Sequence, residues 1–271
     1  MTGHAYSPQV AALFALTGQT VPVVQAPIGS AATPALAAAV SRAGGLGGLA
    51  LSWSDPDAAK AAVNAVRGAA EGRSFFGNFV LHFPCEAFDA ALGAGLPVVT
   101  FSWGIDATRV ARAHRAGAKV GIQIGSAPGA RRALDAGADF LIAQGVEAGG
   151  HVQSTTPGGT LLPGVRAEAG NVPVIAAGGI ASGAAIARAI SAGAAGAMMG
   201  TRFVATAEAA SHDAYKAALV AATGTDTVFT NCFDIGWPYA NSRVLRTSTL
   251  EMWEAAGNPA APYRPGEGDI L

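Results

Sequence analysis

A glycine pair followed by a histidine is the part of the sequence best suited to chemistry. The stretch VEAGGH, residues 146–151, follows the apolar run FLIA, which has the length and composition of a buried strand. His151 carries the side chain that titrates most easily near neutral pH, so it can serve as a general base. Gly149 and Gly150 either form an ordinary turn or let the backbone approach a bulky ligand that the histidine then faces.

The elements that would position this motif follow a repeated pattern. A helical stretch ends in Ala-Gly or a near variant, and a short β-rich run follows, as in HRAGAKVGIQI and LDAGADFLIA. Glycine ends such a helix in the left-handed conformation, and the chain turns into a strand that is buried on both faces. The pattern predicts eight strands, at residues 22–28, 46–51, 75–81, 97–102, 120–125, 139–145, 173–179 and 196–201.

Eight strands that alternate with helices predict an α/β fold of the (β/α)8 TIM barrel type. A doubly wound open sheet is the alternative, because local patterns do not show closure. In a barrel the active site lies at the carboxyl ends of the strands, which is where VEAGGH falls. We expect an FMN-binding barrel over residues 1–222 and a C-terminal lid-like or packing segment of the same domain over residues 223–271, because long irregular stretches often act as lids.

Composition excludes several classes of function. The chain of 271 residues is 51% hydrophobic and 13% charged, with a net charge of −1. No basic patch favours nucleic acid, and no apolar segment of about 20 residues favours a membrane span. Cys85 and Cys232 form neither a disulfide framework nor a zinc site, so we expect a cytoplasmic protein without a metal. The N-terminus lacks the charged start and apolar core of a signal peptide.

Two glycine-rich strand ends predict a phosphate site. Barrels often bind phosphate in the loops after the seventh and eighth strands. The seventh predicted strand ends at Gly178 and Gly179, and the eighth at Gly200 and Thr201. Glycine amides and a threonine hydroxyl are suitable donors for a phosphate, although glycine after a buried strand is often only a turn. The nucleoside triphosphatase P-loop pattern does not occur in the chain.

Taken together, these residues resemble the nitronate monooxygenase family, formerly called 2-nitropropane dioxygenases. The resemblance rests on QAPI after the first strand, Asn78 in the third, AQGVEAGGH at the sixth, AAGGI at the seventh and MGTRF at the eighth. The C-terminal segment GWPYANSRVLRTSTLEMW also resembles family members. One departure is Ile28, which stands where the family usually has methionine.

The resemblance implies non-covalent FMN at the mouth of the barrel. The backbone after the first strand would border the flavin, polar amides would bond its ring or ribityl edge, and the glycine loops would hold its phosphate end. His151 would be the catalytic histidine. On this basis the expected cofactor-binding residues are Ala26, Pro27, Ile28, Asn78, Gln123, Gln144, Gly149, Gly150, Gly178, Gly179, Met199, Gly200 and Thr201.

Five side chains are candidates for the substrate pocket. Trp53, His82 and Trp103 follow the second, third and fourth strands, and Trp237 and Tyr239 lie in the expected lid. The alternative for each tryptophan is core packing, and the alternative for the histidine is a packed or solvent-exposed residue.

The implied reaction is oxidation of alkyl nitronates, and of nitroalkanes, with O2 to a carbonyl compound and nitrite. His151 would remove the α-proton of a neutral nitroalkane. An alternative is an NAD(P)H-dependent enzyme resembling NADH:quinone reductases or flavin-dependent enoyl-acyl-carrier-protein reductases. A flavin-binding protein without turnover is a further alternative. A dehydrogenase with a nucleophilic cysteine is disfavoured, because neither cysteine lies in a matching loop. A homodimer is left open.

Overall fold

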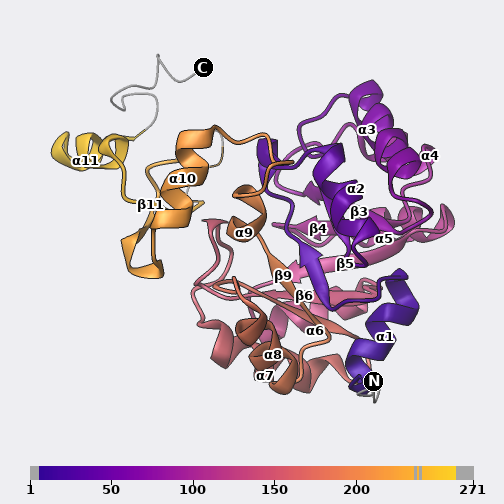
Figure 1. Ribbon diagram of the computed structural model, residues 1–271. Helices are drawn as coiled ribbons and strands as arrows, with labels where there is room; N and C mark the ends of the chain where they lie inside the picture. The colour runs from indigo at the N-terminus through magenta and orange to yellow at the C-terminus, as the bar shows by residue number, and fades with distance from the viewer. Residues whose placement is uncertain (1–5, 235–236, 238–239, 261–271) are drawn as a thin grey trace.

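The chain forms a closed barrel of eight parallel strands, seen in the computed structural model of residues 6–234, 237 and 240–260 (Figure 1). The strand order is β1-β9-β8-β6-β5-β4-β3-β2, and a bridge between Val24 and Leu46 joins the two ends of the sheet. The predicted TIM barrel is therefore confirmed, and every predicted strand is present. The strands are β1 Val23–Gln25, β2 Gly47–Ala50, β3 Phe75–Val80, β4 Val98–Ser102, β5 Lys119–Ile124, β6 Phe140–Gln144, β8 Val174–Ala177 and β9 Gly196–Met199.

Helices alternate with these strands and surround the barrel. Most begin at a serine, threonine or aspartate that caps the first turn, and the Ala-Gly pattern ends them as predicted: Gly117 and Gly137 have φ angles of 82° and 96°. The helices are α1 Pro8–Thr17, η1 Gly29–Ala31, α2 Pro34–Arg42, α3 Pro56–Ala69, α4 Phe88–Gly93, α5 Ala107–Arg115, α6 Ala127–Asp135, α7 Gly158–Ala169, α8 Gly183–Ser191, α9 Thr201–Val204, α10 Asp213–Ala221, η2 Gly224–Asp226 and α11 Ser248–Ala255.

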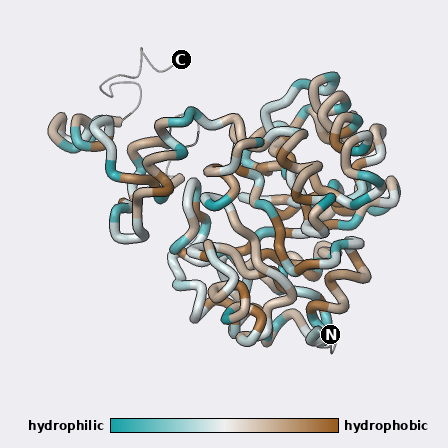
Figure 2. The backbone as a smooth tube through the Cα atoms, viewed as in Figure 1, coloured by the Kyte–Doolittle hydropathy of each residue, from teal (hydrophilic) through white to brown (hydrophobic). Residues whose placement is uncertain are grey.

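The inside of the barrel is filled by large apolar side chains that face glycines. Phe76 and Phe140 belong to the interior cluster, and Leu13 of α1 joins it from the amino end of the barrel. A Cβ atom on Gly121 would lie 2.3 Å from the Phe140 ring, so only glycine leaves room for this ring. In Figure 2, apolar stretches run through the barrel and polar residues concentrate in the outer turns and loops.

Toward the carboxyl end, the interior changes from apolar to polar. Asn78, Thr100 and Gln144 each lie two residues after an apolar member of the interior cluster, and successive side chains of a strand alternate between faces. The three side chains therefore form a layer above the apolar one, and all three are buried. This polar layer lies directly beneath the loops at the mouth of the barrel.

The C-terminal segment contains a small antiparallel sheet instead of the irregular stretch that the sequence predicts. β10 Thr227–Thr230 pairs with β11 Ser242–Leu245, and β11 pairs in turn with β7 Gly150–His151. The histidine of the VEAGGH motif thus lies in a strand that the sequence analysis does not predict. In Figure 1, α10, β11 and α11 stand to one side of the barrel.

Replacing Gly121 by Ala should lower the free energy of unfolding by about 1–3 kcal/mol, the usual cost of overpacking a core. The matched control is Gly68→Ala in α3, where a new Cβ meets no atom within 4 Å. That variant should keep the wild-type stability or gain up to about 1 kcal/mol, since alanine is the better helix former. Chemical denaturation measures both. A Gly121→Ala protein as stable as wild type would contradict the interior packing described above.

Candidate active site

His151 is held at the mouth of the barrel by its backbone. Its strand β7 pairs with β11, and the N–H of Val152 donates to the carbonyl of Asn241 at 2.9 Å. Gln144 of the polar layer donates to the His151 carbonyl at 3.2 Å and accepts the N–H of Gln153 at 3.0 Å. One side chain of the barrel and one strand of the C-terminal sheet therefore fix the position of this backbone.

Two tryptophans surround the imidazole of His151. Trp237 stacks on it with ring centroids 4.2 Å apart and an interplanar angle of 27°. Trp103 meets it edge to face at 6.4 Å. The Nε2 atom is buried and has no hydrogen-bond partner among the described residues. A buried polar atom of this kind is costly unless a ligand or water satisfies it, so its lone pair marks a binding position.

The environment of His151 keeps its imidazole neutral. Burial lowers the pKa of His151 below its ordinary value of 6.5, because the charged form loses hydration. A hydrogen bond with the Phe233 backbone and the charge of Asp234 raise the pKa, but their combined effect is smaller. A ring bonded to the backbone through one nitrogen presents the other as a base. At neutral pH this side chain is therefore ready to accept a proton.

Ser242 lies directly opposite His151 across the strand pair. The two are register partners in β11 and β7, so their side chains share one face of the sheet. Ser242 is buried, and its Oγ atom also lacks a hydrogen-bond partner among the described residues. The site thus combines an unpartnered base and an unpartnered hydroxyl. The sequence analysis missed Ser242, because only the strand pairing brings it to His151.

The glycine-rich loop is anchored by two charged side chains that the sequence analysis did not assign. Glu147 accepts the N–H of Gly158 at 2.9 Å and so caps α7, whose own N-cap residue, Pro157, offers no side-chain acceptor. Arg243 donates to the carbonyl of Val146 through Nε and Nη2, at 3.2 and 3.0 Å. An acidic residue within the glycine-rich VEAGGH motif was the only sequence signal that could have pointed to Glu147. No local signal existed for Arg243.

An aromatic wall extends outward from the histidine. His82 stacks on Trp237 at 6.1 Å, and Trp53 meets the same ring edge to face at 6.3 Å. Phe83, which was not predicted, packs among them at 5.1 Å from Trp53 and 5.4 Å from Trp237. Trp53 is 58% exposed and Trp237 only 7%, so the wall runs from solvent to the buried imidazole.

Four predicted substrate residues, Trp53, His82, Trp103 and Trp237, therefore share one cluster with His151. Their contact with substrate stays a prediction. Tyr239, the fifth, lies outside the described residues.

The glycines predicted to hold the cofactor line a second part of the mouth. A Cβ atom on Gly149 would lie 3.1 Å from Oγ1 of Thr201, and one on Gly200 would lie 3.5 Å from side-chain atoms of Ala26 and Ile28. The ends of β6, β9 and β1 thus converge. Gly149 and Thr201 are both exposed.

The loop after β8 joins Gly149, Gly200 and Thr201 to form a glycine cradle. Gly178 and Gly179 have φ angles of 108° and 67°, which L side chains rarely adopt. A Cβ on Gly178 would lie 3.0 Å from the backbone of the VEAGGH loop, and one on Gly179 would lie 3.2 Å from Cβ of Glu147. The loop after β8 therefore packs closely against the loop after β6.

The remaining predicted cofactor residues have partners within the chain. Asn78 accepts a hydrogen bond from Thr100 at 2.9 Å, and Gln123 donates to Gln153 at 2.7 Å. The Met199 carbonyl accepts the Ala26 N–H, and the Pro27 carbonyl accepts the Gly29 N–H. Gly150 pairs with Arg243 in the small sheet. Their contacts with a cofactor stay predictions.

Within the residues that the structure describes, no cluster of three or more His, Cys, Asp or Glu side chains is arranged to hold a metal ion. None of the described helices combines the length and apolar character that a membrane crossing needs.

A closed barrel with a neutral imidazole and glycine loops at its carboxyl mouth defines a TIM-barrel enzyme. The model of the family described as nitronate monooxygenase matches residues 11–87 and 85–266. The chain belongs to the nitronate monooxygenase family, which consists of flavin-dependent oxidoreductases, and the resemblance found in the sequence is confirmed.

Two relatives with different activities are similar in sequence to this chain. Nitronate monooxygenase of Pseudomonas aeruginosa is 34% identical, over 92% of this chain and 83% of that protein. A hydroxy-methyl-oxo-octahydroindene-carboxyl-CoA dehydrogenase of Mycobacterium tuberculosis is 38% identical, over 89% of this chain and 67% of that protein.

Two solved structures have the same fold. FabK from Thermotoga maritima has a TM-score of 0.82 and 36% identity, covering 89% of this chain and 76% of FabK. Nitroalkane oxidase from Streptomyces ansochromogenes has a TM-score of 0.80 and 32% identity, covering 93% of this chain and 83% of that one.

Replacing Arg243 by Met should weaken the pairing of β7 with the hairpin of β10 and β11 while leaving the barrel intact. Loss of the bonds to the Val146 carbonyl should raise the hydrogen-exchange rate of the Val152 N–H about tenfold, since a hydrogen bond to a charged group contributes about 1.5–3 kcal/mol. Arg246→Met is the control, because Arg246 forms only an exposed ion pair with Glu254. Equal exchange at Val152 in the two variants would contradict an anchoring role for Arg243.

Proposed function

We propose that the protein is an FMN-dependent nitronate monooxygenase that oxidises alkyl nitronates, and nitroalkanes after proton removal by His151, with O2. One observation carries the proposal: the Nε2 atom of His151 is buried and unpartnered, and burial lowers the pKa of His151. A neutral, unpartnered imidazole at the mouth of a flavin-family barrel suits a general base. An ordinary turn, the other interpretation of Gly-Gly-His, gives no reason for that burial.

The glycine cradle fits a flavin phosphate. A Cβ on Gly149 would lie only 3.1 Å from Oγ1 of Thr201, one on Gly200 would be in van der Waals contact with Ala26 and Ile28, and the loop after β8 has positive φ angles at both glycines. Backbone N–H groups in such loops are suitable phosphate donors. Gly179, Gly200 and Thr201 would hold the phosphate end. Ala26 and Pro27, on the neighbouring strand end, would border the ring through their backbone.

Each residue of the site then has a defined task. Bound FMN supplies the capacity to accept electrons from the substrate and pass them to O2. His151 accepts the α-proton of a nitroalkane at Nε2. The Ser242 hydroxyl, on the same face, donates a hydrogen bond to an oxygen of the nitro group, on which charge accumulates as the proton leaves. Trp237 and Trp103 keep water from the imidazole, so it stays neutral.

A second candidate is oxidation of a bulky CoA thioester, because the dehydrogenase of Mycobacterium tuberculosis is 38% identical. The aromatic wall supports this candidate, since Trp53 and His82 are exposed and extend the aromatic cluster away from the buried imidazole. The carbon next to a thioester carbonyl is also acidified, so the base would have the same task. Anaerobic stopped-flow mixing with a nitronate, a CoA thioester or NADH distinguishes these functions and the NAD(P)H-dependent alternative by which compound bleaches the flavin.

The FMN site is tested by Gly179→Val and Gly200→Val. The purified protein should be yellow and release FMN, not FAD, on denaturation. Each variant should bind FMN about tenfold more weakly or worse, since a displaced contact to a charged group costs about 1.5–3 kcal/mol. Gly159→Val is the control, because a Cβ there meets no atom within 4 Å. Wild-type FMN affinity in both folded variants, or a protein that stays colourless with FMN, would refute the assignment.

The role of His151 is tested by His151→Asn with two substrates. A neutral nitroalkane must lose its α-proton, so its turnover should fall about 10²–10⁴-fold. The pre-formed nitronate has already lost that proton and should be affected much less. FMN content serves as the control and should match wild type. Equal losses on both substrates would make His151 a binding residue only.

The pH profile of the wild-type protein gives a second measurement of the same role. The base must be neutral, and burial lowers its pKa, so the midpoint of the acidic limb of kcat/KM for the nitroalkane should lie below pH 6.5. This acidic limb should be absent from the His151→Asn profile. A midpoint above pH 6.5 would contradict the lowered pKa of His151.

A further inference from the structure

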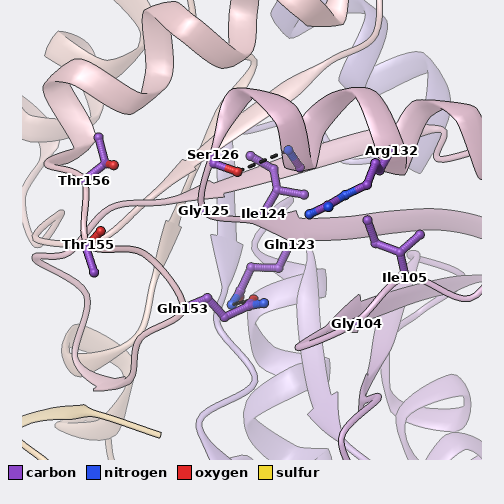
Figure 3. Close-up of a pocket in the computed structure, with 11 residues that line it drawn as sticks. Gly104, Ile105, Gln123, Ile124, Gly125, Ser126, Arg132, Gln153, Thr155 and Thr156 are labelled. Atoms are coloured by element: carbon purple, nitrogen blue, oxygen red, sulfur yellow. Dashed lines mark hydrogen bonds between the residues drawn. The ribbon is translucent and has the colours of Figure 1, made fainter. Parts of the chain in front are cut away.

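A cavity of about 670 Å³ lies at the carboxyl end of the barrel, above β4 and β5. Three loops surround it: the one after β4, the one after β5, and the one between β7 and α7 (Figure 3). Cavities of about 300–1,000 Å³ are typical of sites for drug-sized ligands. Its lining residues are Gly104, Ile105, Gln123, Ile124, Gly125, Ser126, Gly129, Arg132, Gln153, Thr155 and Thr156.

Two lining residues of the cavity are close in sequence to residues of the candidate active site. Gln153, in its lining, lies two residues after His151 and bonds Gln123 at 2.7 Å. Gly104, on another side, directly follows Trp103, whose ring contacts the imidazole. Gln153 and Gly104 therefore place the edge of the cavity beside residues that are close to the imidazole of His151. The glycine cradle lies elsewhere, after β6, β8 and β9, so this cavity is separate from the phosphate loops.

The lining of the cavity favours an anion. Arg132 extends from α6 into the group of lining residues (Figure 3); it is exposed, and its guanidinium makes no hydrogen bond or ion pair with the residues that the structure describes. The preceding Arg131, by contrast, pairs with Glu168 at 2.7 Å. None of the eleven described lining residues is acidic.

Hydroxyl groups complete the set of donors. Ser126 accepts the Gly129 N–H to cap α6 and keeps its own proton to donate. Thr155 and Thr156 line the opposite side of the cavity in Figure 3. A guanidinium matches a carboxylate or a phosphate, and the hydroxyl groups add polar donors elsewhere in the lining. Ile105, which is 36% exposed, provides apolar surface for the carbon chain that leads to it.

We propose that this cavity binds the anionic end, a carboxylate or a phosphate, of an elongated substrate whose reactive carbon lies at His151. The inference rests on the proposed function for the reacting end and adds the class of substrate: a molecule with a chain long enough to pass Trp103. Arg132 is the residue that selects the anion.

Binding is tested by calorimetry on the protein as purified. The probes are octyl phosphate, octanoate, octanol and octylammonium. An anionic probe should bind more tightly than octanol, and octylammonium should bind most weakly. Arg132→Gln should weaken anion binding about tenfold, the usual value of a charge-assisted hydrogen bond, and leave octanol unchanged. Arg131→Gln is the matched control and should leave every affinity at the wild-type value. The tighter of the two anions identifies phosphate or carboxylate as the preferred group.

Turnover separates this proposal from the proposed function. The nitronate of ω-nitrooctanoate should have a lower KM than that of nitrooctane, and Arg132→Gln should remove the difference without changing kcat. Equal wild-type affinity for octanol and both anions, or equal effects of Arg131→Gln and Arg132→Gln, would overturn the cavity assignment even if both nitronates react. Selective anion binding without turnover of either nitronate would overturn the proposed function and leave the cavity assignment in place.

Discussion

The pairing of two residues of β7 with β11 is the interaction on which the rest of the site depends. A two-residue strand has little stability of its own, yet the proposed role of His151 as a base requires one orientation of its side chain. The pairing joins segments far apart in sequence, as the 97-residue separation between Val146 and Arg243 illustrates. It brings Ser242 opposite the imidazole, and the same C-terminal segment carries Trp237. The barrel alone would supply the histidine, Trp103 and Gln144, but not Trp237 or Ser242.

Burial and polar interactions have opposite effects on the pKa of His151. Burial against Trp237 disfavours the charged form, whereas the Phe233 backbone and the charge of Asp234 favour it. Because burial has the larger effect, the ring remains neutral and its free nitrogen remains basic. The same burial leaves Nε2 and Ser242 Oγ without partners, a cost that a bound substrate can relieve. Unsatisfied polar atoms at this position thus favour binding over further stability.

The barrel could be predicted from the sequence, because the patterns that indicate its strands and helix ends are local. Each strand is a short apolar run after an Ala-Gly helix end, and glycines such as Gly137 adopt the predicted left-handed conformation. The glycine loops after β8 and β9 followed from their place in the barrel. β7 and β11 could not be predicted, since two- and four-residue strands carry no periodicity and are defined only by pairing between distant segments. The partner of Glu147 was hidden for the same reason, because Gly158 lies beyond an intervening loop.

The small sheet also sets an order for the assembly of the protein during synthesis. All eight barrel strands are complete once Met199 has been made, but β11 begins only at Ser242. Contacts close in the chain form before distant ones, and a ribosome adds about 5–20 residues per second. The barrel can therefore form first, with its mouth and glycine loops still uncovered by the C-terminal hairpin. The hairpin of β10 and β11 can dock only after that, so Ser242 and Trp237 reach their places beside His151 after the barrel strands have been made.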